Sequence, residues 1–161
     1  PAAGKPLLSE GVGLYRSHDG AERWEKVNAS PPLLYVKDFS VDPRSSQRIL
    51  LGAADAGGGD QSGGLYFTED GGTTWRRIGR KGSQTFGGYF HPKRDGWLYM
   101  TLTEGAPGAG LWLSRDHGQT WEEMSELPFS NIQRVEFDPA NDGVVYVTTF
   151  GGSVWRGPSG K

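Results

Sequence analysis

Cysteine, long basic runs and long apolar runs are missing from the sequence, and each absence excludes a class of protein. Without cysteine, the chain can form no disulfide, thiol nucleophile or cysteine-ligated metal site. The formal net charge is -2 and no run of five basic residues occurs, so the positive surface that neutralises nucleic-acid phosphates is absent. The longest apolar runs span only a few residues, as at 143–147, which is too few to cross a bilayer. We expect neither a nucleic-acid partner nor a membrane span.

Glycine and aromatic residues, in contrast, are abundant. The 161 residues include 26 glycines, 10 prolines and six tryptophans. Glycine or proline interrupts every window long enough for three helical turns. Aromatic-rich chains are not typical of disorder, and many short strands joined by glycine-rich turns fit this composition better. The composition therefore predicts one all-β domain, 1–161, with almost no helix.

A short motif, called the box below, occurs three times. Residues 17–24, 68–75 and 114–121 follow the pattern Ser/Thr-x-Asp-x-Gly-x-Thr-Trp. The first copy departs from it twice, with Ala21 in place of glycine and Arg23 in place of threonine, which predicts a looser turn. The box tryptophans are separated by 51 and then 46 positions, which is the length of one four-stranded propeller blade.

Other strings recur with the same period and complete a blade of strands A to D, counted outwards from the channel. Strand A ends before Asp-Pro or His-Pro, where proline stops the ladder because it lacks an N–H group. Strand B is apolar, and strand C directly precedes the box. The predicted order is strands C and D at 11–28, whole blades at 33–79 and 84–125, and strands A to C at 131–157.

Two whole blades and two partial ones do not close a ring, because closed propellers have four to eight blades. The unpaired edges of an open propeller tend to pair with other strands. We therefore expect the remaining blades to come from another chain or from a second copy of this one. The chain is predicted to be the C-terminal part of a larger propeller.

These repeats resemble the Asp-box, or bacterial neuraminidase repeat, propellers. That group includes sialidases, xyloglucan-cleaving glycoside hydrolases, sortilin-type receptors and a photosystem II assembly factor. The resemblance covers essentially the whole chain, although the Arg-Ile-Pro string of sialidases is missing. It implies a secreted or periplasmic protein that is carbohydrate-active, either glycoside hydrolase-like or glycan-binding. The alternative is a non-catalytic scaffold that binds a protein partner, because one fold hosts many functions.

The residues that recur in all three boxes are predicted to be structural. The aspartates Asp19, Asp70 and Asp116 can accept backbone N–H groups within the hairpin. The tryptophans Trp24, Trp75 and Trp121 are expected to pack under a neighbouring strand.

Three residues near the predicted channel are the candidates for catalysis: Asp38, Glu104 and Arg134. Glycoside hydrolysis uses two carboxylates about 5 to 9.5 Å apart. Asp38 occupies the same place in its strand A as Gly87 and Arg134 do in theirs. Such non-repeating polar residues indicate a site, although side chains lining a solvent-filled channel show the same pattern.

The candidate ligand-binding residues lie near loops. Asp55 precedes the glycine-rich loop 57–64 and Asp60 lies within it. Trp97, Phe129, Phe86 and Phe150 could stack on sugar rings or pack between blades. The three histidines, His18, His91 and His117, occur at unmatched positions, which argues against a shared metal site. No metal or cofactor is expected, and the residues leave open whether the chain is an enzyme.

Overall fold

The computed structural model describes residues 14–27, 35–55, 62–79, 81, 83–103 and 108–160. These residues form thirteen strands and no helix, so no helix in this part of the chain could span a membrane. The short strands are β1 (Tyr15–Arg16), β2 (Glu25–Lys26), β6 (Arg76–Arg77) and β10 (Glu122–Glu123). The longer strands are β3 (Val36–Asp42), β4 (Ser45–Ala53), β5 (Gly64–Thr68), β7 (Thr85–Phe90), β8 (Leu98–Leu102), β9 (Gly110–Ser114), β11 (Ile132–Phe137), β12 (Val144–Thr149) and β13 (Val154–Pro158).

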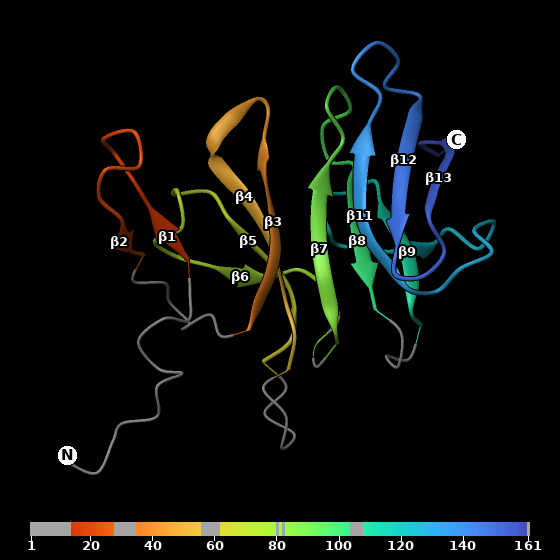
Figure 1. Ribbon diagram of the computed structural model, residues 1–161, viewed down its shortest axis with the longest axis horizontal. Helices are drawn as coiled ribbons and strands as arrows, with labels where there is room; N and C mark the ends of the chain where they lie inside the picture. The colour runs from red at the N-terminus through yellow and green to blue at the C-terminus, as the bar shows by residue number, and fades with distance from the viewer. Residues whose placement is uncertain are drawn as a thin grey trace.

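The strands form four antiparallel sheets in the order of the chain. The first sheet is β1–β2, the second β3–β4–β5–β6, the third β7–β8–β9–β10 and the fourth β11–β12–β13. The sheets stand in a row, and their inner strands β3, β7 and β11 are neighbours (Figure 1). This arrangement confirms the prediction of an all-β propeller portion with two four-stranded blades and two partial ones.

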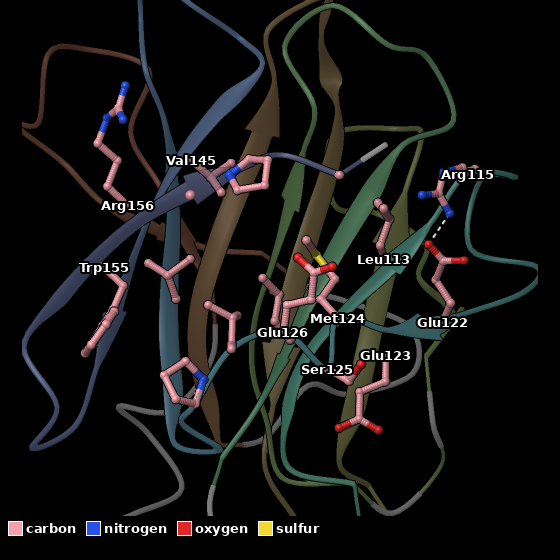
Figure 2. A pocket seen from close by; sticks show the side chains of 17 residues that line it. Leu113, Arg115, Glu122, Glu123, Met124, Ser125, Glu126, Val145, Trp155 and Arg156 are labelled. Atoms are coloured by element: carbon pink, nitrogen blue, oxygen red, sulfur yellow. Dashed lines mark hydrogen bonds and ion pairs between the residues drawn. The ribbon is translucent and has the colours of Figure 1, made fainter.

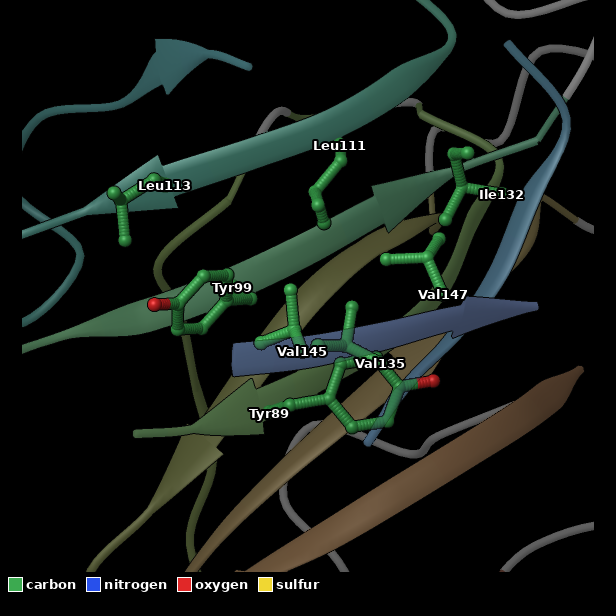
Figure 3. Packing of buried hydrophobic residues seen from close by; sticks show 8 residues of the cluster. All are labelled: Tyr89, Tyr99, Leu111, Leu113, Ile132, Val135, Val145 and Val147. Atoms are coloured by element: carbon green, nitrogen blue, oxygen red, sulfur yellow. The ribbon is translucent and has the colours of Figure 1, made fainter. Parts of the chain in front are cut away.

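Apolar side chains fill the space between neighbouring sheets. Successive residues of a strand point to opposite faces, so β8 directs Leu98, Met100 and Leu102 towards the second sheet and Tyr99 towards the fourth. Figure 3 shows Tyr99 among the side chains that join the third and fourth sheets. The second and third sheets are therefore stabilised by neighbouring sheets on both sides.

Each box forms the turn that joins the last two strands of its sheet. The Asp70 carboxylate accepts hydrogen bonds from the Thr74 hydroxyl at 2.6 Å and the Thr74 backbone N–H at 2.9 Å. Asp116 accepts the same pair from Thr120, at 2.5 and 2.8 Å. These hydrogen bonds lower the pKa of both aspartates to about 2. The carboxylates are thereby held ionised inside the turns.

The first box keeps this geometry with fewer bonds. Asp19 accepts the Arg23 backbone N–H at 3.0 Å, which lowers the pKa of Asp19, but residue 23 has no hydroxyl to add a second bond. Ala21 has a φ of 73°, in the left-handed region where a Cβ is strained. This strain and the missing hydrogen bond make the first box a weaker turn than the other two.

The box tryptophans differ in burial. Trp75 is buried and donates from Nε1 to the Gly72 carbonyl at 2.7 Å, and Trp121 is half-buried. Trp24 is 62% exposed, so the expectation that it packs under a neighbouring strand is wrong. Trp75 packs beside Leu14 of the preceding sheet, and the described residues contain no sheet that precedes β1 and β2.

Replacing Ala21 by glycine is expected to stabilise the chain. The substitution relieves about 1 to 2 kcal/mol of left-handed strain in the folded chain. The greater backbone entropy of glycine in the unfolded chain offsets about half of this gain. The expected net increase in the free energy of unfolding is below about 1 kcal/mol. Urea unfolding measures the change. The matched control is Gly72→Ala at the same box position with a φ of 99°, which is expected to destabilise. A stabilising Gly72→Ala would contradict this account of the turn.

His91 replaces aspartate in one of the turns between strands A and B. Its Nδ1 accepts the backbone N–H groups of Lys93 at 3.1 Å and Arg94 at 3.0 Å, just as Asp42 accepts that of Arg44 at 3.0 Å. The ring is fully buried, and burial together with the Arg94 charge lowers the pKa of His91. Protonation at Nδ1 would break both hydrogen bonds.

We therefore expect His91 to weaken the fold in acid. A histidine whose pKa is lowered by folding contributes stability above its unfolded pKa of about 6.5 that is lost as pH falls further, with a slope of at most about 1.4 kcal/mol per pH unit. Urea unfolding between pH 7 and pH 5 measures this slope. His91→Asn keeps an acceptor without titrating and should flatten the dependence. An unchanged slope in His91→Asn contradicts the assignment.

Candidate functional site

All three inner strands are bulged at the same position of the repeat. The pairing register shifts between Val36 and Asp38 in β3, between Thr85 and Gly87 in β7, and between Ile132 and Arg134 in β11. A bulge leaves one residue unpaired and redirects the side chains beside it. The bulged residues are Lys37, Phe86 and Gln133.

The residues that follow the bulges come together across the inner strands. Arg134 Nη1 lies 3.7 Å from Asp38 Oδ2, and the Tyr89 hydroxyl donates to the same Asp38 oxygen at 2.9 Å. The Asp38 side chain is 15% exposed. Asp38 and Arg134, the two candidates chosen because they differ at equivalent positions of the repeat, are therefore neighbours in space.

Charge and burial set the protonation states of the partners of Asp38. Burial, reinforced by the Asp38 charge, raises the pKa of Tyr89 well above its ordinary value. The Asp38 charge likewise raises the pKa of Arg134. Tyr89 therefore remains a hydrogen-bond donor and Arg134 remains a cation at neutral pH.

Sequence reasoning missed Tyr89, although the signal was present. Tyr89 matches Ser40 and Glu136 in the repeat, so this position varies among the three inner strands as much as that of Asp38 does. Ser40 donates to the Gly88 carbonyl at 2.6 Å, and Glu136 accepts from Arg134 Nε at 3.4 Å. Two successive inward positions of strand A thus carry the polar groups of the site.

Gly87 makes room for the Tyr89 hydroxyl. A Cβ at residue 87 would lie 2.3 Å from the Tyr89 oxygen, so any side chain there would displace the ring. The Gly87 backbone N–H donates to the Thr101 hydroxyl at 3.0 Å, which in turn donates to the Gln133 carbonyl at 3.0 Å. This network joins the third and fourth sheets under the site.

Two hollows border the bulges. The larger, about 510 Å³, lies along the inner strands and is lined by Asp38, Tyr89, Arg134 and Glu136 among others. The smaller, about 240 Å³, lies at the end where strands A begin and strands B end. Its lining includes Lys37, Phe86, Gln133, Thr103 and Phe150. Phe150 is 73% exposed, so its ring is open to a ligand.

The remaining predicted residues lie away from Asp38. Asp55 accepts the Gly63 backbone N–H at 2.6 Å beside the glycine-rich loop. Trp97 lies at the opposite end of its sheet, where the guanidinium groups of Arg94 and Arg115 contact its ring. Phe129 packs against Trp155, with ring centroids 4.7 Å apart. Asp60 and Glu104 lie outside the described residues.

The charges of the site suit hydrogen bonding to a ligand. Asp38 and Glu136 both bind the Arg134 guanidinium, so a cation separates the two carboxylates that line the larger hollow. General acid catalysis needs a protonated carboxylic acid facing a second carboxylate across the substrate. The described residues instead offer donors and acceptors of the kind that sugar hydroxyls bind. They contain no cluster of three or more residues that could ligate a metal.

A row of antiparallel sheets with neighbouring inner strands is characteristic of a β-propeller, and solved structures share this fold. An ancestral enzyme of glycoside hydrolase family GH74 matches with a TM-score of 0.67 at 20% identity, over 92% of this chain and 20% of that one. YCF48 from Cyanidioschyzon merolae matches with a TM-score of 0.62 at 16% identity, over 91% of this chain and 44% of that one. The chain is a partial propeller with the fold of the GH74 enzymes.

The sequence is also similar to a curated enzyme, the oligoxyloglucan-reducing end-specific xyloglucanase of Emericella nidulans. The two are 30% identical over 141 residues, which cover 79% of this chain. The chain spans only 16% of the length of that enzyme. No protein-family model matches the chain.

Gly87→Ala is expected to destabilise the chain by about 1 to 3 kcal/mol, as overpacking typically does, because the new Cβ displaces the Tyr89 hydroxyl from Asp38. Urea unfolding measures the loss. Tyr89→Phe removes the hydroxyl alone, and in the double variant part of the Gly87→Ala loss should be recovered. Strictly additive losses would show that Gly87 does not accommodate the hydroxyl.

Proposed function

We propose that this chain is part of a carbohydrate-active propeller protein and that its bulged inner strands bind a glycan. The observation that carries the proposal is the 30% identity to a xyloglucanase over 79% of the chain. The glycan class that this relative suggests is a xyloglucan-type β-glucan. The shared propeller fold is compatible with this function but does not by itself specify it.

The geometry of the two hollows supports glycan binding. Binding sites for small molecules combine apolar or aromatic walls with a few polar groups that fix orientation. The exposed Phe150 ring offers an apolar face for a sugar ring, and Lys37 and Gln133 border the same hollow. Asp38 and Arg134 provide charged hydrogen-bonding groups in the adjoining hollow.

Hydrolysis would require groups beyond those described. The carboxylates of the larger hollow share Arg134, so we propose that Asp38 and Arg134 position a glycan and that any acid–base pair is completed by other parts of the propeller. A polymeric glycan does not cross membranes, so a protein that acts on it works outside the cytoplasm. We accordingly propose a secreted or periplasmic location.

A second function, a scaffold that binds a protein partner, is favoured by one observation. The last strand of the fourth sheet carries exposed apolar side chains, with Val154 60% and Trp155 39% exposed. Apolar residues at the free edge of a sheet are typical of protein-binding surfaces.

Titration calorimetry of the 161-residue chain with xyloglucan oligosaccharides tests the first function. Binding is expected, and Phe150→Ala should weaken it about tenfold, which corresponds to a stacking contact of about 1.4 kcal/mol. The matched control is Trp24→Ala, which removes another exposed aromatic ring and should leave affinity unchanged. Cello-oligosaccharides of equal length report whether the xylose branches are recognised. Absence of binding to both glycans would reject the glycan proposal in favour of the scaffold.

A further inference from the structure

The three bulged residues carry different chemical groups at one end of the inner strands. Lys37 has an ammonium group, Phe86 an aromatic ring and Gln133 an amide. All three line the smaller hollow of about 240 Å³, and β7 contacts β3 on one side and β11 on the other. The hollow therefore presents a cation, an apolar face and a hydrogen-bonding group in the order of the three inner strands.

The backbone is held in place at each of the three bulges. In the second sheet, β3 pairs with β4 on both sides of Lys37. A Cβ on Gly52 would lie 2.2 Å from the Phe86 carbonyl oxygen, so the second and third sheets are in close contact there. The Gln133 carbonyl accepts a hydrogen bond from the Tyr89 hydroxyl at 2.9 Å. Because the backbone is already ordered, a ligand has to order only the side chains, which lowers the cost of binding.

Lys37 is the one charged side chain among the described residues that line the smaller hollow. Asp38 and Arg134 line the larger hollow instead, where they lie 3.7 Å apart. The Asp55 carboxylate accepts a backbone N–H group at 2.6 Å, and Glu104 lies outside the described residues. Within the described part of the chain, no carboxylate forms an ion pair with the Lys37 ammonium group. An unpaired cation therefore borders this hollow.

A groove between the third and fourth sheets has a different charge pattern. It has a volume of about 470 Å³ and is bordered by Met124 (Figure 2). Figure 2 also shows the ion pair between Arg115 and Glu122 at its rim. The charged residues that line this groove have both signs: Arg115, Arg156, Glu122, Glu123 and Glu126. A ligand there would meet carboxylates as well as guanidinium groups, whereas the described lining of the smaller hollow offers a cation alone.

The groups around Lys37 suit a sugar that carries a negative charge. Phe86 and Phe150 offer apolar ring faces on which a sugar ring can stack. The side-chain amides of Gln84 and Gln133 can donate to and accept from sugar hydroxyls. A hydrogen bond between an ammonium group and a carboxylate is about twice as strong as one between neutral groups. A uronic acid combines a sugar ring, hydroxyls and a carboxylate in one unit.

We infer that the smaller hollow binds an acidic glycan and that Lys37 is the specificity-determining residue that binds the carboxylate of a uronic acid. The uronic acid unit lies at β3, and the neutral units extend past Phe86 towards Gln133. This inference rests on the proposed function, because it takes the bulged strands as the glycan site, and it adds the acidic class of glycan. It also fixes the orientation of the glycan along the inner strands.

Two isomeric tetrasaccharides test both the charge and the orientation. Both are β-1,4-linked chains of glucose with one glucuronic acid, which is the non-reducing end unit in one isomer and the reducing end unit in the other. Titration calorimetry with the 161-residue chain compares each isomer with cellotetraose. One isomer is expected to bind about tenfold more tightly than cellotetraose, with a gain that shrinks at high salt. The other isomer should bind about as tightly as cellotetraose, because its carboxylate lies away from Lys37.

Variants of Lys37 test the assignment of the cation. Lys37→Gln should weaken binding of the favoured isomer about tenfold, to the level of the other isomer. Lys37→Arg keeps the positive charge and should retain part of the preference. The matched control is Lys26→Gln, which removes the charge of an exposed lysine in β2 and should leave the preference unchanged. Circular dichroism checks that all three variants remain folded.

Several results would overturn the inference. Equal gains for both isomers would show attraction to the overall charge of the surface and no ordered site. A preference that persists in Lys37→Gln would show that another group binds the carboxylate. Binding of cellotetraose as tight as that of both isomers, or tighter, would identify a neutral site and would leave the proposed function standing. Absence of binding by all three sugars would reject the proposed function together with this inference.

Discussion

Burial of both faces of each sheet is the constraint on which the rest of this structure depends. β8 shows it directly: Leu98, Met100 and Leu102 face one neighbouring sheet and Tyr99 faces the other. A fully buried side chain of this size contributes about 1.5 to 3 kcal/mol, so a sheet with one neighbour loses a large part of its stabilisation. Among the described residues, the exposed Trp24 beside β2 and the exposed Trp155 in β13 are examples of places where this burial is incomplete.

The site uses the part of the sheet that packing leaves free. The bulges at Lys37, Phe86 and Gln133 redirect side chains where the inner strands begin. Because the bulge recurs in β3, β7 and β11, it is a common feature of the blade architecture and not a special feature of one blade. The residues after it do not recur, and this variation places a carboxylate and a guanidinium around one hollow. Gly87 contributes by having no side chain, which lets Tyr89 reach Asp38.

Much of the fold was predictable because the repeat is visible in the sequence. Three boxes at blade spacing predicted the four sheets and their strand order, and the structure has that order. Asp38 and Arg134 were predictable as non-repeating polar residues of the inner strands, but their proximity was not, because β7 lies between β3 and β11. The Tyr89 hydroxyl was not found, because tyrosine on an apolar strand resembles a core residue and only its contacts with Asp38 and the Gln133 carbonyl distinguish it. The exposure of Trp24 could not be predicted either, because the same motif contains a buried or half-buried tryptophan in the other two boxes.

The sequence by itself determined the local chemistry of this protein: the hairpins held by Asp70 and Asp116, the alternation of apolar side chains, and the period that makes each blade a copy of the last. These depend on residues close together in the chain, so a pattern records them. Only the tertiary structure decided which side chains meet between blades, such as Asp38 with Tyr89 and Arg134, and which surfaces remain uncovered, such as the groove at Met124. Those outcomes depend on contacts between residues separated by one or two whole blades, and the spacing of motifs carries no information about the direction in which a single side chain points.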